Sequence, residues 1–102
     1  MRTMVKIGMP AEAGNAAIKN GTLPKLMANA IQELKPEAAY FFAEDGRRTA
    51  LLVIDLKEAA QIPWVAERFF MGMNAEITFT PVMVAEDLQK GLEMAARSMA
   101  AV

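Results

Sequence analysis

Three side chains carry groups that suit acid–base or ligand-binding chemistry: the ammonium of Lys6, the phenol of Tyr40 and the carboxylate of Asp55. In a partly dry cavity, an ammonium beside a carboxylate can orient an anionic substrate, and the carboxylate can accept a proton. Thr78 offers a hydroxyl to the same ligand. No motif of fixed spacing joins these four candidate ligand-binding residues, so plainer roles stay open. Asp55 can cap a turn, and Lys6 can extend into solvent. Tyr40 and Thr78 can pack in a dimer interface.

The composition excludes several classes of site and partner. The chain has no histidine and no cysteine, which rules out Cys-containing zinc sites, iron–sulfur clusters, His-ligated haem, disulfides and thiol nucleophiles. We therefore expect no metal and no cofactor. Eleven basic and twelve acidic residues give a net charge of −1, which leaves no basic excess for nucleic acid or an anionic membrane. No apolar run approaches the ~20 residues of a membrane span, so we expect a cytoplasmic protein.

Four strands must carry these residues, because apolar and β-branched residues alternate or cluster in four short segments. The segments are residues 3–9, 38–43, 48–56 and 76–84. Asp45-Gly46 separates the second from the third and is typical of a hairpin turn. Pro81 lacks an N–H, which favours an edge position for the fourth strand.

Helical spacing of apolar residues predicts helices between and after the strands. Stripes of this kind run through residues 23–34, 62–73 and 88–99. The alanine-rich stretch from Ala11 precedes the first stripe, and Gly21 and Pro24 predict a break near residues 20–23, giving two helical pieces. Glu86 and Asp87 stand at the start of the last helix, where the helix dipole favours acidic groups.

The order of elements predicts a single α+β domain over residues 1–102. Two right-handed strand–helix–strand crossovers, each leaving room for a strand of the other, give a four-stranded antiparallel sheet in the order 4-1-3-2. This is a ferredoxin-like plait, βαββαβ, with an extra C-terminal helix. Its helices cover one face of the sheet.

The other sheet face is predicted to be apolar. A two-residue loop at Asp45-Gly46 places Tyr40, Phe42, Leu51 and Val53 on that face. A three-residue loop with a bulge would shift the parity of one strand. The opposite face then packs under the helices and is expected to hold these residues: Val5, Ile7, Ala39, Phe41, Ala43, Ala50, Leu52, Ile54, Ile77 and Phe79.

The order of elements and the apolar second face resemble the dimeric α/β-barrel superfamily, in which two plaits pack sheet to sheet around a cavity. The stretches 36–41 (PEAAYF) and 69–76 (FFMGMNAE) resemble small uncharacterised bacterial proteins of this type. The resemblance covers nearly the whole chain and brings no catalytic motif. The wider group includes cofactor-free monooxygenases, lactone isomerases and haem enzymes, and a chain without histidine cannot belong to the His-ligated haem branch.

The preferred hypothesis is a homodimer that binds a small apolar or aromatic molecule in a cavity between its two sheets. Phe42, Leu51 and Val53 are the expected interface residues, because such a patch must be hidden from water. Whether the protein is an enzyme stays open. In one alternative, a cofactor-independent oxygenase or isomerase uses the Lys6, Tyr40 and Asp55 side chains. In another, the interface is filled and the dimer is purely structural.

Overall fold

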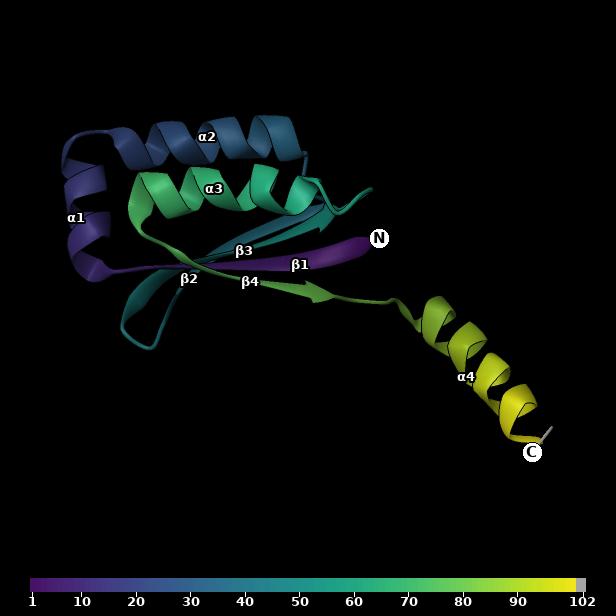
Figure 1. The fold of residues 1–102 in the computed structure, drawn as a ribbon. Helices are drawn as coiled ribbons and strands as arrows, with labels where there is room; N and C mark the ends of the chain where they lie inside the picture. The colour runs from purple at the N-terminus through teal and green to yellow at the C-terminus, as the bar shows by residue number, and fades with distance from the viewer. Residues whose placement is uncertain (101–102) are drawn as a thin grey trace.

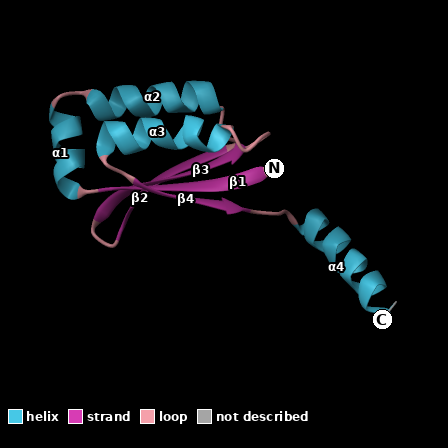
Figure 2. Cartoon of the chain, viewed as in Figure 1, coloured by secondary structure: helices cyan, strands magenta, loops and turns pink. Residues whose placement is uncertain are grey.

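The fold is a four-stranded antiparallel sheet with helices on one face (Figures 1 and 2). A computed structural model describes residues 1–100. The elements are β1 (Arg2–Met9), α1 (Ala11–Lys19), α2 (Thr22–Leu34), β2 (Ala38–Glu44), β3 (Arg47–Asp55), α3 (Gln61–Met73), β4 (Glu76–Pro81) and α4 (Ala85–Ala100). The strands lie in the order β2-β3-β1-β4. The α+β class, the sheet and its strand order are therefore as predicted.

The core lies between the sheet and helices α2 and α3, which run side by side over it (Figure 1). Alternate residues of β1 and β3 point into this layer, and Phe69 of α3 is fully buried. Close packing of apolar side chains from both layers stabilises the fold. The buried cluster consists of Val5, Ile7, Met9, Ala17, Ala30, Ala50, Leu52, Ile54, Val65, Phe69, Met73 and Ala75.

The β2–β3 hairpin has the two-residue turn predicted for it. Glu44 pairs with Arg47, and the two residues between them, Asp45 and Gly46, have φ values of 53° and 73°. Positive φ at both positions is the type I′ geometry that matches the twist of a hairpin. The register pairs Tyr40 with Leu51. The parity expected from a two-residue loop is confirmed.

The first crossover contains two helices rather than one, so the element order is βααββαβα. Gly21, with φ of 78°, separates α1 from α2. Glycine adopts this left-handed conformation without the steric cost that other residues bear. The break expected near residues 20–23 is confirmed.

The burial of three hairpin residues differs from expectation. Phe41 and Ala43 were expected in the core, but Phe41 is 57% exposed and Ala43 is exposed as well. Both lie on edge strand β2, and Phe41 lies beside the start of α2 rather than under it. Thr49 lies on the opposite parity yet is buried, and its hydroxyl donates to the carbonyl of Arg47. Strand β4 ends at Pro81 instead of residue 84. Beyond it, one further backbone bond joins the Val82 N–H to the carbonyl of Arg2.

Helix α4 projects away from the sheet and the other helices (Figure 1). None of its described residues is buried. The projection lengthens the molecule to 60 Å and raises the radius of gyration to 17.1 Å, against ~13 Å for a compact domain of about 100 residues. The C-terminal helix was predicted, but the sequence did not predict where it lies.

Candidate functional site

The candidate site is the sheet face opposite α2 and α3, which we call the open face. Its middle is apolar: Leu51 of β3 lies between Tyr40 of β2 and Lys6 of β1, and Val53 is paired with Met4. Tyr40 is 61% exposed, whereas Leu51 and Val53 are half-buried. No helix of residues 1–100 covers this band of apolar side chains (Figure 2).

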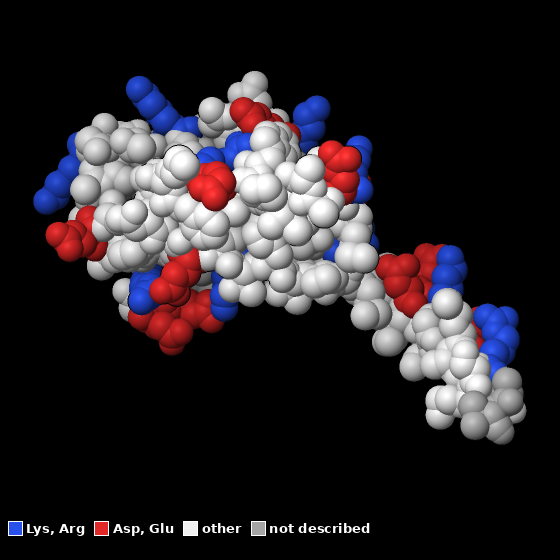
Figure 3. All heavy atoms as spheres, in the orientation of Figure 1, with Lys and Arg blue, Asp and Glu red and all other residues white. Residues whose placement is uncertain are grey.

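Charged side chains gather at the hairpin end of the open face. The ammonium of Lys6 lies 3.3 Å from a carboxylate oxygen of Glu44, and the guanidinium of Arg47 lies 2.9 Å from Glu76. These two ion pairs join all four strands, β1 to β2 and β3 to β4. Figure 3 shows acidic atoms clustered at the hairpin with basic atoms on either side.

A hollow of about 430 Å³ opens between these ion pairs, and we call it the hairpin hollow. Thr78 lines it, paired in register with Lys6 across the β1–β4 ladder. The lining combines cationic donors, carboxylate acceptors and hydroxyls, so it can bind a polar group that both donates and accepts hydrogen bonds. The full lining is Lys6, Gly8, Glu44, Asp45, Arg47, Thr49, Glu76 and Thr78.

The electrostatics of the hairpin hollow are balanced rather than cationic. Each of its two cations is paired with a carboxylate, and Asp45 adds a further negative charge. An anionic ligand at Lys6 is repelled by Glu44 unless it displaces that carboxylate, and these partly exposed pairs are weak enough for such an exchange. A neutral group with a carbonyl or hydroxyl needs no displacement. The hollow therefore fits a neutral polar substituent better than a free carboxylate.

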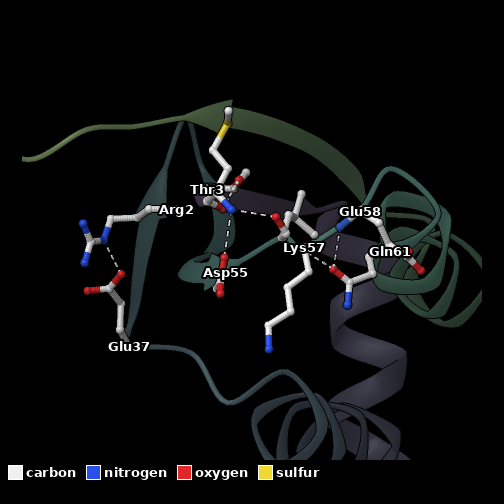
Figure 4. Close-up of polar contacts among 9 residues, drawn as sticks. Arg2, Thr3, Glu37, Asp55, Lys57, Glu58 and Gln61 are labelled. Carbon is white, nitrogen blue, oxygen red and sulfur yellow. Dashed lines mark hydrogen bonds and ion pairs between the residues drawn. The ribbon is translucent and has the colours of Figure 1, made fainter. Parts of the chain in front are cut away.

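A second polar cluster occupies the opposite end of the sheet (Figure 4). The amino group of Met1 donates to Asp55 Oδ1 at 2.8 Å and to the carbonyl oxygen of Leu56. Arg2 forms an ion pair with Glu37 nearby. The hydrogen bond from the Met1 amino group, followed by its charge, lowers the pKa of Asp55 below its ordinary value.

This second cluster borders a hollow of about 610 Å³ that reaches the start of α4. Like the hairpin hollow, it is open to solvent and bordered by ion pairs, Met1–Asp55 and Arg2–Glu37. The hairpin hollow adjoins the apolar band and contains both Lys6 and Thr78, so we regard it as the better ligand site.

The structure brings together some of the candidate residues and separates others. Lys6 and Thr78 are paired on neighbouring strands, and Tyr40 lies on the same face two strands from Lys6, with Leu51 between them. Asp55 does not join them, because it pairs with Arg2, four residues along β1 from Lys6. That separation is ~13 Å at the usual rise of a strand. Lys6 takes Glu44 as its carboxylate partner instead.

The expected interface residues also lie on this face. Leu51 and Val53 occupy the apolar band. Phe42, which pairs with Thr49 near the turn of the hairpin, is 40% exposed and also borders a groove beside α2. The sequence analysis missed Glu44, Arg47 and Glu76 as site residues. A two-residue turn already placed Glu44 opposite Arg47, but adding Glu76 required the β1–β4 register.

Residues 1–100 contain neither a group of metal ligands nor a membrane-spanning helix. No three acidic, histidine or cysteine side chains are grouped in a way that could hold a metal ion. No helix in this part of the chain has the length and apolarity needed to cross a bilayer. Comparison with known proteins found no matching family model, no similar curated protein and no similar solved structure.

Proposed function

We propose that the protein is a cytoplasmic homodimer that packs two open faces together and binds a small apolar or aromatic molecule between them. The observation that carries this proposal is the uncovered apolar band, in which Tyr40 is 61% exposed beside Leu51 and Val53. A sheet with one helix-covered face needs a partner for a second apolar face. A second copy supplies a self-complementary surface.

The distribution of charge over the open face supports a protein interface. Its middle is apolar, and its two ends carry ion pairs: Lys6–Glu44 at the hairpin end and Met1–Asp55 at the other. An apolar centre with a polar, solvated rim is the usual anatomy of a subunit interface. Because each end carries both signs, two copies related by a twofold axis can meet without an excess of like charge.

The ligand class follows from the junction of the apolar band with the hairpin hollow. A ring can lie against Tyr40 and Leu51, while its polar substituent reaches Lys6 and Thr78 in the hollow. Burial of a ring against apolar side chains provides most of the affinity, and the few polar contacts orient it. The enzyme alternative has less support, since the Asp55 carboxylate that it would use as a base lies away from Lys6.

The first prediction tests the dimer through charge placed on the open face. Tyr40→Asp introduces a carboxylate at a position that is exposed in the single chain, so the monomer should fold normally and the dimer should dissociate. Met71→Asp is the matched control, because Met71 is 82% exposed on α3 and lies away from the open face. Light scattering should give a dimer for the wild type and Met71→Asp and a monomer for Tyr40→Asp. A wild-type monomer would refute the proposal.

Native mass spectrometry of freshly purified protein tests the ligand. We expect added mass on the dimer that is absent from the Tyr40→Asp monomer. The purely structural dimer with a filled interface would be favoured by two results together. The dimer would carry no added mass, and the NMR resonances of Tyr40 and Lys6 would not shift when aromatic compounds are added.

A further inference from the structure

Helix α4 carries an apolar stripe that no part of residues 1–100 covers. Leu88, Leu92, Ala95 and Met99 recur at intervals of four, three and four residues, which places them on one side of the helix. Leu92 is 61% exposed, and no described residue of α4 is buried. The charged residues Lys90 and Arg97 lie on the opposite side of the helix. In proteins, most of the stability of a helix comes from packing its apolar face against a partner rather than from helix propensity.

The sheet offers a groove that lacks a cover. It has a volume of about 330 Å³, lies between edge strand β2 and α2, and we call it the β2 groove. Its lining is almost wholly apolar and includes Phe41, which is exposed on the strand edge. An exposed apolar edge strand invites aggregation, and covering it with a helix is one of the ways in which proteins prevent this. The apolar lining residues are Met9, Leu23, Pro24, Met27, Phe41 and Phe42.

Helix α4 cannot lie along the β2 groove of its own chain. Strands β4 and β2 are opposite edges of the sheet, ~14 Å apart at the usual strand spacing. Pro81 pairs with Thr3, whereas the groove lies at the Met9 end of β1, ~20 Å further along the strands. The link from Val82 to Val84 has three residues and reaches only ~10 Å. On the helical face, α2 and α3 block the way.

We propose that α4 is an exchanged arm: its Leu88–Met99 stripe packs into the β2 groove of a second copy, and the second copy returns the contact. This inference rests on the proposed homodimer and adds its second contact. Reciprocal exchange is a common route to a dimer and covers both unpartnered surfaces at once.

The area of a stable dimer favours the arm. The whole open face, four strands wide, measures about 19 by 20 Å, so two faces bury on the order of 760 Å², below the ~1,600 Å² of a standard interface. A 16-residue helix is ~24 Å long and ~10 Å wide, so two exchanged arms bury on the order of 1,000 Å² more. The sheet faces and the arms together reach the usual size.

Cross-linking tests the exchange directly, because the chain has no cysteine of its own. The double variant Pro24→Cys/Ala95→Cys places one thiol in the β2 groove and one in the α4 stripe. A short bis-maleimide should link these thiols between chains and give a covalent dimer. In the control Pro24→Cys/Arg97→Cys, the second thiol is on the far side of α4 and should link at least ten times less. A link within one chain would contradict the exchange and show that α4 folds back onto its own chain. A link between two chains of the single variant Ala95→Cys would contradict it and show that two α4 helices pair with each other.

A matched pair of charge variants gives an independent test. Leu92→Glu alters the stripe, and Met94→Glu alters another side of the same helix, while the two side chains have nearly equal exposure, 61% and 63%. Leu92→Glu should raise the dimer dissociation constant at least tenfold, and Met94→Glu should leave it within twofold. If the wild type is a dimer, but the two variants have equal dissociation constants and the cysteine variants form no interchain link, the exchanged arm is wrong and the sheet-face dimer remains. A wild-type monomer would overturn both.

Discussion

At the scale of single residues, Lys6 and Asp55 serve different ends of the sheet. Lys6 pairs with Glu44 in the hairpin hollow, and Asp55 accepts a hydrogen bond from the Met1 amino group. The sequence places both residues on strands, but it does not show which partner each one takes. That choice depends on the register of strands far apart in the chain. A local motif could not have supplied it.

The pKa of Asp55 provides a prediction at this scale. Its partner lowers the pKa, so the ion pair stabilises the folded protein above the ordinary carboxyl range and is lost as the pH falls through the lowered pKa. Acetylation of the Met1 amino group removes the charge and the strongest donor. We expect an NMR titration of the Asp55 carboxyl to move to higher pH in the acetylated chain. An unchanged midpoint would contradict the assigned cause.

At the scale of elements, the sequence predicted periodicity well and contacts between elements less well. Alternation in β1 and β3 and the Asp45-Gly46 turn placed Leu51 and Leu52 on opposite faces, as observed. Phe41 was misplaced because parity alone does not show how far α2 extends over an edge strand. The packing of α4 could not be predicted, since an amphipathic stripe identifies a buried face but not its partner.

Leu51 and Leu52 test this division between the two faces. Leu52 is fully buried in the core, so Leu52→Ala should lower the free energy of unfolding by about 2–5 kcal/mol. Leu51→Ala should change the monomer's stability much less and should instead weaken the dimer. Chemical denaturation at a protein concentration low enough to dissociate the dimer measures the first effect, and sedimentation measures the second. Equal losses of monomer stability would mean that the open face is part of the chain's own core.

At the scale of the whole molecule, a compact sheet-and-helix body carries two uncovered surfaces and a projecting arm. The proposed homodimer would account for all three features, since its open faces would cover each other and each arm would cover the other chain's edge strand. In that assembly, the extent of 60 Å would belong to a single subunit.

The reactivity of Tyr40 tests the central claim most directly, because Tyr40 is the chain's single tyrosine and Trp64 its single tryptophan. Nitration of Tyr40 should be at least tenfold slower at concentrations where light scattering gives a dimer than after dilution to the monomer. Oxidation of Trp64, which lies on α3 on the covered side of the sheet, should proceed at the same rate in both. A dimer in which Tyr40 reacts as fast as in the monomer would contradict the assignment of the open face as the interface.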